Sequence, residues 1–324
     1  MASGRGAFWR ATPAARASVC CRRSRARRSC PREPAMKAPP FAYHDPRSRD
    51  DLIGLLAELE NAKLLAGGQS LVPMLNFRVV APDHLIDINR IPDLAGIRLS
   101  ADDVVLGAMT RQCDLHASAE LAATAPIIRQ ALAHVGHFQT RSRGTIGGSC
   151  CHLDPAAELP ALCALLDAEF DVAGPNGARI VKGGDWFKGY LESALEEREY
   201  LQSIRLRRWP AGHGYGFSEY ARRRGDFAIA GAGALLEFAE DARIGRAAIV
   251  VFGVEPAPIR LVEAERTLVG QTFSEALLAE VAAQASALDA MADVHVSAAY
   301  RRRLAGVVTR RALAEAARPA REAV

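Results

Sequence analysis

Hydrophobic and polar positions alternate in short runs along most of the chain, and these runs predict a protein of mixed helices and strands. Residues 52–59 carry apolar side chains at helical spacing after a polar N-terminal cap at residues 48–51. Residues 84–89 alternate as a strand does, and Pro92 follows. The same patterns predict strands at 97–99, 104–107, 108–109 and 199–206, helices at 113–121, 126–135 and 155–166, and a hairpin over 170–181.

The segment 207–214 interrupts this pattern with tryptophan, proline and two glycines, so we place a domain boundary there. Three longer strands are predicted beyond it, at 215–221, 228–238 and 247–254, followed by helices at 259–268, 273–288 and 297–317. A three-stranded antiparallel sheet with helices packed on one face is the natural arrangement of such elements. No internal repeats are visible.

One stretch near the N-terminal end combines features of a ligand-binding turn. An apolar run that includes Lys63, Leu65 and Ala66 meets the glycine pair Gly67-Gly68, then Gln69 and Ser70, and a second apolar run starts at Leu71. This pattern predicts a buried strand, a sharp turn and a short helix. Glycines adopt positive φ and let a ligand lie against the main chain, and successive N–H groups form a concave nest that suits phosphate. An ordinary turn is the alternative interpretation of a single glycine pair.

A second stretch repeats this chemistry, because Thr145, Ile146, Gly147, Gly148 and Ser149 again place a glycine pair beside hydroxyl groups. Two nests would suit the two phosphates of one diphosphate. The Gly-x-Gly-x-x-Gly pattern of a Rossmann turn and the Gly-Lys-Ser/Thr of a P-loop are both missing. The sequence therefore disfavours a Rossmann-bound nicotinamide cofactor and ATP.

Charge is distributed unevenly. Residues 1–35 contain nine arginines and one acid, so they contribute +8 to a net charge of +4 and leave −4 on the remainder. A mildly acidic body argues against nucleic acid as its main partner, although a targeting peptide or a basic nucleic-acid-binding arm remain alternatives for the first segment. We interpret residues 1–35 as a disordered arginine-rich extension and prefer Met36 as the true start.

Composition and cysteine spacing narrow the class further. Apolar residues make up 49% of the 324-residue chain and charged residues 24%, as in ordinary globular proteins. No apolar run approaches the roughly 20 residues that span a bilayer. No Cys-x-x-Cys pair is present, so we expect no metal site, and we interpret Cys150 and Cys151 as buried small side chains of a reduced, cytoplasmic protein. His134, His137 and His152 lack partner constellations, so we nominate no catalytic residue.

Five ordered motifs together resemble the FAD-binding medium subunit of molybdenum hydroxylases, the group of aerobic carbon monoxide dehydrogenase and xanthine dehydrogenase. The resemblance covers residues 36 to the C-terminus. Its motifs are the two glycine stretches, Leu85-Ile86-Asp87-Ile88-Asn89, Asp154-Pro155-Ala156-Ala157-Glu158-Leu159-Pro160 and Arg223-Arg224-Gly225-Asp226-Phe227-Ala228.

The resemblance implies a fold and a set of cofactor contacts. It implies an α+β FAD-binding domain of the PCMH or vanillyl-alcohol-oxidase-like type at 36–208, with subdomains at about 36–92 and 93–208, and a carbon monoxide dehydrogenase flavoprotein C-terminal-like domain at 213–318. Both glycine loops would grip the FAD diphosphate. Glu158 would bond a ribose hydroxyl, with a solvated helix face as the alternative, and the main chain of Asp226 or Phe227 would contact the isoalloxazine. For the three consecutive arginines before Asp226, a subunit interface is the preferred interpretation.

The resemblance also implies a division of labour among subunits. This chain would carry FAD, while two-iron two-sulfur clusters and the molybdopterin cofactor would lie on a small and a large partner subunit, as a dimer of heterotrimers. Electrons would pass from the clusters through FAD to quinone, NAD or dioxygen, in the cytoplasm or at the inner face of the membrane through partners. The alternatives are a stand-alone FAD-dependent oxidoreductase of the same fold superfamily, and a nucleic-acid-binding protein that uses residues 1–35. The holoenzyme's substrate would be set by the large subunit.

Overall fold

The structure is a computed structural model that describes residues 37–318, and residues from Lys37 onward form one compact unit. The predictions for residues 1–35 and for a start at Met36 lie outside the described residues. No helix within 37–318 is long and apolar enough to cross a membrane.

The first part of the fold is a parallel sheet with strand order β1-β3-β2 and two helices. Its elements are β1 (Ala42–His44), α1 (Arg49–Glu58), β2 (Ala62–Leu65), α2 (Leu71–Asn76) and β3 (His84–Asp87). Ser48 caps α1 in a capping box with Asp51. Because all three strands run the same way, the segments that follow β2 and β3 lie at one edge of the sheet, where open parallel sheets bind ligands.

The second part is a five-stranded antiparallel sheet of order β4-β5-β10-β6-β7 with helices on one face. Its elements are η1 (Pro92–Leu94), β4 (Ile97–Leu99), β5 (Asp103–Gly107), α3 (Gln112–Ala117), α4 (Ala119–Thr124), α5 (Pro126–Leu132), α6 (Phe138–Arg143), α7 (Ile146–His152), α8 (Glu158–Leu165), β6 (Glu169–Gly174), β7 (Gly177–Lys182), α9 (Gly183–Trp186), β8 (Phe187–Gly189), β9 (Glu192–Ser193) and β10 (Tyr200–Arg207). Every residue of α8 is buried, as expected for a helix that is apolar on all sides.

The third part is an antiparallel sheet of order β11-β12-β13-β14 with three helices. Its elements are β11 (Gly214–Tyr220), β12 (Ala230–Phe238), β13 (Ile244–Phe252), β14 (Ile259–Arg260), α10 (Val262–Leu268), α11 (Glu275–Ala285) and α12 (Ala298–Ala316). Helix α12 lies directly on β11, because a Cβ added at Gly214 or Gly216 would be 1.7 Å from the carbonyl oxygen of Ala316 or 2.1 Å from that of Ala312. Glycine is therefore required in β11 for this close packing.

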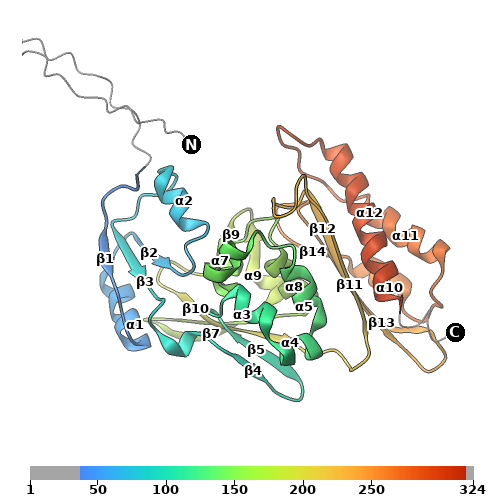
Figure 1. Cartoon of the computed structure of the whole chain (residues 1–324), viewed down its shortest axis with the longest axis horizontal. Coiled ribbons are helices and arrows are strands. Elements are labelled where there is room, and N and C mark those ends of the chain that lie inside the picture. Colours follow the sequence, from blue (N-terminus) through green and yellow to red (C-terminus); the bar gives the residue numbers. More distant parts are fainter. Residues whose placement is uncertain (1–36, 319–324) are drawn as a thin grey trace, which may run out of the picture. The chain divides into compact units, whose positions relative to one another are not determined.

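Both faces of the third sheet are covered, which differs from the prediction of helices on one face. Ala230, Ala232 and Ala234 of β12 face the core shared with α10–α12, whereas Leu235 and Val250 face the core shared with α5 and α8. Figure 1 shows the green helices α5 and α8 between the second part's sheet and the long strands β11–β13. The strands of a sheet that is buried on both faces show little alternation of apolar and polar residues. The sequence pattern therefore could not reveal that α5 and α8 cover the second face.

Several predicted elements have different bounds in the structure. The helix predicted at 113–121 is broken at Ser118, whose hydroxyl caps α4 by accepting from the Leu121 N–H. The helix predicted from Ile259 begins at Val262, because Ile259 and Arg260 pair with β13 as a fourth strand. Residues 108–109 form a turn and not a strand. Strand β1 was missed because three residues are too few to establish a period.

Candidate functional site

The first glycine loop connects β2 to α2 at the carboxyl edge of the parallel sheet. Gly68 has φ +72°, a conformation that favours glycine, whereas Gly67 has no positive φ. The N–H groups of four consecutive residues, from Gly67 to Ser70, have no acceptor among residues 37–318. Such a run of free donors is the nest that an anion requires. The side chain of Gln69 folds back onto the loop, with its Nε2 donating to the Gly67 carbonyl at 3.2 Å.

The residues that flank this loop contribute differently. Lys63 and Leu65 lie on β2, Ala66 follows the strand, and Leu71 is the first residue of α2. The Lys63 side chain is exposed, while Leu65, Ala66 and Leu71 are half-buried. Main-chain contact is therefore the contribution that the apolar members of this group can make to a polar ligand.

The second glycine loop is built in another way, because its N–H groups already have acceptors. The N–H groups of Ile146 and Gly147 donate to the Thr110 and Ala108 carbonyls at 3.2 and 2.8 Å, and that of Gly148 donates to the Thr145 hydroxyl at 3.0 Å. A Cβ on Gly147 would lie 2.6 Å from the Ala108 carbonyl oxygen. Ile146 is buried, and the Ser149 side chain is half-buried. This loop is a fixed wall beside the nest and not a second set of free amide donors.

The two loops meet. A Cβ added at Gly67 would lie 2.4 Å from the carbonyl oxygen of Arg143, two residues before Thr145. A Cβ added at Gly148 would lie 3.6 Å from the Cβ of Ala66. The structure thus brings together the glycine stretches that the sequence marked as two halves of one diphosphate site.

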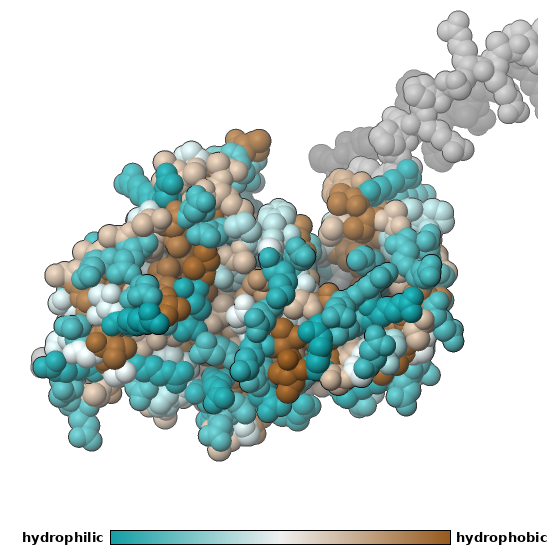
Figure 2. Space-filling view, turned by 180° about the vertical axis from the view of Figure 1, so that it is seen from behind, coloured by the Kyte–Doolittle hydropathy of each residue, from teal (hydrophilic) through white to brown (hydrophobic). Residues whose placement is uncertain are grey.

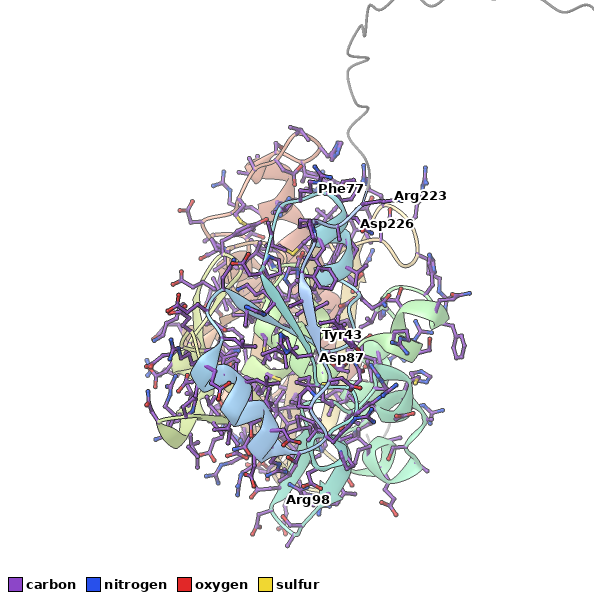
Figure 3. All side chains as sticks on the ribbon, turned by 90° about the vertical axis from the view of Figure 1, so that its left-hand side faces the viewer. Tyr43, Phe77, Asp87, Arg98, Arg223 and Asp226 are labelled. Atoms are coloured by element: carbon purple, nitrogen blue, oxygen red, sulfur yellow. The ribbon has the colours of Figure 1, made fainter. Side chains whose placement is uncertain are left out.

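Polar side chains that the sequence analysis did not assign to the site connect the loops. The Asn89 Nδ2 donates to the Ala66 carbonyl at 2.8 Å, and the Asn89 Oδ1 accepts from the Arg111 guanidinium. Arg111 also donates to the Arg143 carbonyl. Asn89 in turn bonds Asp87, which accepts from the Tyr43 hydroxyl at 2.6 Å, and Figure 3 shows the Tyr43 and Asp87 side chains meeting.

Glu158 is buried at the start of α8, near a second acid, Glu219. Burial, together with the nearby Glu219 on β11, raises the pKa of Glu158 to about 8. Burial raises the pKa of Glu219 to about 7, and its Oε2 atom is buried without a hydrogen-bond donor among the described residues. The Nδ1 atom of His134 is 4.0 Å from that oxygen, but burial and Arg224 lower the pKa of His134. Both shifts favour the neutral forms, so they weaken this contact as an ion pair.

The arginine-rich loop after β11 is exposed. Figure 3 shows Arg223 and Asp226 on a loop that projects from the body, and the Phe227 side chain is 71% exposed. Gly225 has φ +85° and rests on the segment before α6, since a Cβ there would lie 2.6 Å from the His137 ring. The structure therefore joins this loop to α6, whose Phe138 is 67% exposed.

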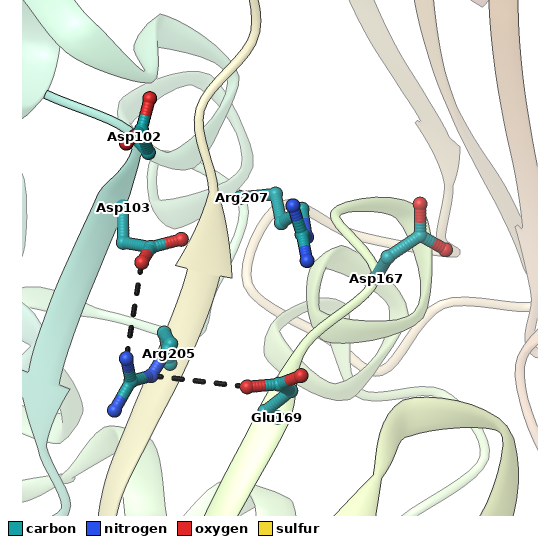
Figure 4. A pocket seen from close by; sticks show the side chains of 6 residues that line it. All are labelled: Asp102, Asp103, Asp167, Glu169, Arg205 and Arg207. Carbon is teal, nitrogen blue, oxygen red and sulfur yellow. Dashed lines mark ion pairs between the residues drawn. The ribbon is translucent and has the colours of Figure 1, made fainter.

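Two cavities within residues 37–318 are lined by residues outside the glycine loops. One of about 470 Å³ is lined by charged and polar side chains of α1 and the five-stranded sheet, among them Arg49 and Asp171. The other, of about 280 Å³, is shown in Figure 4, where Arg205 lies 3.8 Å from both Asp103 and Glu169. The first is lined by two carboxylates and three arginines, and the second by four carboxylates and two arginines. No group of three His, Cys, Asp or Glu residues suited to a metal ion exists within 37–318.

The residues present fit a flavin dinucleotide. The free N–H groups of the first loop suit a diphosphate. A carboxyl group that keeps its proton near neutral pH, as Glu158 does, can exchange hydrogen bonds with a sugar hydroxyl without repelling the diphosphate.

Fold and site together define a dinucleotide-binding protein that lacks the Rossmann glycine pattern. The family model of the FAD-binding domain in molybdopterin dehydrogenase matches residues 39–209, and that of the carbon monoxide dehydrogenase flavoprotein C-terminal domain matches residues 215–316. The chain belongs to this family of FAD-binding subunits, and its cofactor is FAD.

The chain aligns with similar proteins over almost the whole length of each. The chain is 39% identical over 294 residues to the 6-hydroxypseudooxynicotine dehydrogenase complex subunit alpha of Paenarthrobacter nicotinovorans, covering 89% of this chain and 99% of that one. It is 41% identical over 278 residues to the carbon monoxide dehydrogenase medium chain of Afipia carboxidovorans, with 85% and 96% covered. A solved carbon monoxide dehydrogenase from Hydrogenophaga pseudoflava matches with a TM-score of 0.84 at 38% identity, covering 87% and 99%.

Proposed function

We propose that this chain is the FAD-carrying electron-transfer subunit of a molybdenum hydroxylase built from three kinds of subunit. The observation that carries the proposal is the meeting of two glycine loops, one with four free N–H groups, in a chain about 40% identical to such medium chains along nearly its whole length. The small partner would hold two-iron two-sulfur clusters and the large partner the molybdopterin cofactor. The assembly would be a dimer of heterotrimers in the cytoplasm or at the inner face of the membrane.

When bound, FAD supplies the redox chemistry, since it exchanges electrons singly or in pairs. The chain's own residues bind and orient it. The N–H groups from Gly67 to Ser70 would hold the diphosphate, and the second loop from Thr145 to Ser149 would wall the site. Glu158 would bond a sugar hydroxyl while holding its proton, and the main chain of Asp226 or Phe227 would border the isoalloxazine. No residue acts as nucleophile or general base in this role.

The surface formed by α6 and the loop 222–227 is the part that we assign to contact with a partner. It exposes Phe138 and Phe227 among the arginines 222–224. Aromatic residues and arginine are the types enriched at interfaces. By contrast, hydrophobic side chains on the face seen in Figure 2 form separate small patches between polar residues. We also propose that the FAD-binding domain spans residues 36–208 and the C-terminal domain residues 213–318.

Relatives that share this fold carry names with unrelated substrates, carbon monoxide and a nicotine-derived compound. The substrate of the holoenzyme would accordingly be set on the large subunit. Quinone, NAD or dioxygen would accept the electrons from FAD.

The test is purification from the native source through a tag on this chain. We expect a yellow complex with two further polypeptides, one rich in iron and one containing molybdenum, and FAD, not FMN, released on denaturation. A chain that holds no flavin when supplied with FAD would overturn the proposal. A chain that purifies alone and turns over a substrate would favour the stand-alone oxidoreductase instead.

A further inference from the structure

Arg111 stands where the two glycine loops meet. It follows β5, and its main chain pairs with that of Thr145 in an isolated antiparallel bridge. The N–H of the next residue, Gln112, donates to the Gly144 carbonyl at 2.9 Å. The backbone of Arg111 is thereby fixed to the second loop before its side chain makes any contact.

The Arg111 side chain reaches from this anchor to the first loop. One guanidinium nitrogen, Nη1, donates to the Arg143 carbonyl, the same oxygen that leaves no room for a side chain at Gly67. The other, Nη2, donates to the Asn89 Oδ1. Asn89 is oriented by its own bonds to Asp87 and to the Ala66 carbonyl. A continuous path of hydrogen bonds therefore runs from Ala66 in the first loop through Asn89 and Arg111 to Arg143 beside the second.

Arg111 has no ion-pair partner among residues 37–318 in this arrangement. Both of its acceptors are neutral oxygens, and no carboxylate among residues 37–318 lies within ion-pair distance of it. The group is half-buried, and burial and the neighbouring Arg143 lower its pKa, while the more distant Asp114 and Asp87 offset this only in part. A half-buried positive charge without an ion-pair partner is costly, and an anion bound over the loops would offset that cost.

We infer that Arg111, oriented by Asn89, is a positioning residue for the FAD diphosphate: it fixes the spacing of the two glycine loops and places a positive charge beside the bound anion. The inference rests on the proposed function, because it takes the ligand to be FAD. Arginine suits this task because its planar fork holds two acceptors at once, which lysine does not.

The test is FAD binding by the full-length chain after its flavin has been removed, in three variants. Arg111→Gln loses both the charge and one of the two bonds, and we expect FAD to bind at least about tenfold more weakly, with a smaller dependence of Kd on salt. Arg111→Lys keeps the charge but not the two-pronged contact, so it should bind weakly while retaining the salt dependence of the parent. Asn89→Ala cuts the path at the first loop and should also weaken binding.

Arg49→Gln is the matched control. Arg49 donates to a backbone carbonyl, that of Asp93 at 2.8 Å, and to a side-chain amide oxygen, that of Gln202 at 3.3 Å, and neither acceptor belongs to a glycine loop. This variant should bind FAD like the parent. Thermal unfolding of each flavin-free variant shows whether it is folded.

The outcomes separate the two proposals. A parent chain that does not bind FAD contradicts the proposed function itself. A parent that binds FAD while folded Arg111→Gln and Asn89→Ala bind it equally well, with the same salt dependence, overturns the role of Arg111 alone. If Arg111→Gln does not fold, Arg111→Lys and Asn89→Ala decide the question by the same readout.

Discussion

At the scale of single residues, the buried acids Glu158 and Glu219 make the folded protein sensitive to pH. Their pKa values in the folded protein, about 8 and about 7, lie above the ordinary value of 4.5. Between pH 4.5 and 8 the folded state therefore holds protons that the unfolded state has lost. The free energy of unfolding must fall as pH rises through this window, by up to roughly 1.4 kcal/mol per pH unit for each proton held.

We predict that Glu219→Gln makes the free energy of unfolding less dependent on pH. The amide carries no charge to bury, so the flavin-free variant should be more stable than the parent at pH 8, by about 1–3 kcal/mol, and similar to it near pH 5. Urea unfolding at several pH values between 5 and 8.5 measures the effect. Glu263→Gln is the control, since Glu263 lies on the exposed face of α10 in a surface ion pair. An equal change of unfolding free energy with pH in Glu219→Gln and the parent would contradict the prediction.

The site residues were open to sequence analysis to different degrees. The glycine stretches and Glu158 lie in motifs, so their chemistry was visible in the chain. Glu219 and Arg111 were not, because each acquires its role only from a neighbour distant in sequence, Glu158 for one and Arg143 for the other. Asn89 belongs to the motif of residues 85–89, but nothing in that motif shows that the Asn89 amide reaches Ala66.

At the scale of elements, the first glycine loop shows that adjacent glycines can be required for separate reasons. Gly68 needs glycine for its φ of +72°, whereas Gly67 needs it for space against the Arg143 carbonyl. The sequence suggested one reason for the pair, positive φ beside a ligand. It could not show the second, because the obstructing atom lies 76 positions further along the chain.

We predict that Gly67→Ala separates the two loops. Its Cβ would meet backbone that is held by Arg111, so the loops must move apart, and FAD affinity should fall by at least about tenfold with a loss of stability of roughly 1–3 kcal/mol. FAD titration and urea unfolding measure the two effects.

Gly54→Ala is the control for this change. Gly54 lies inside α1 with nothing within 4 Å of an added Cβ, so alanine there should stabilise the protein by about 0.5–1 kcal/mol and leave FAD binding intact. Unaltered FAD binding by Gly67→Ala would mean that the contact between the loops is looser than the structure shows.

Elements were predictable where their pattern is long and one-sided. The strands β11–β13 and the helices α11 and α12 were found within a few residues, because their apolar periods extend over seven residues or more. The short β1, β8 and β9 were missed, and the break at Ser118 was not anticipated, since a hydroxyl that caps a new helix reads like any polar residue within a helical face.

At the scale of the whole molecule, the FAD-binding part and the C-terminal sheet share one hydrophobic core. That core includes Ile127 and Leu165 from the helices α5 and α8, and Leu235 and Val250 from the sheet. Helix α8 is also held by the C-terminal part at both ends. The Gly253 N–H donates to the Pro155 carbonyl at 2.8 Å just before it, and Arg260 bonds the Ala164 and Leu165 carbonyls at its end. The helix that carries Glu158 is therefore positioned by the C-terminal sheet.

Arg260 is one side chain that links α8 to the C-terminal part. Its guanidinium bonds the last carbonyls of α8 and also pairs with Asp167 and with Glu265 of α10, at 2.8 Å to each. Carbonyls at a helix C-terminus have no partner within the helix, so a cation there satisfies them and suits the helix dipole. Removing the guanidinium would leave those carbonyls without a donor and the half-buried Glu265 without its cation, with only the Ile249 N–H, among residues 37–318, donating to that carboxylate.

We predict that Arg260→Met destabilises the protein by about 3 kcal/mol, the usual result of removing one member of a buried pair. Arg266→Met is the matched control, because Arg266 makes a single ion pair with Glu263 on the exposed face of α10. This variant should change stability by less than about 1 kcal/mol. Urea unfolding followed by circular dichroism measures both. Since α8 carries Glu158, flavin should dissociate from Arg260→Met at lower urea than from the control. Equal stability of the two variants would mean that the shared apolar core alone holds the C-terminal sheet against the FAD-binding part.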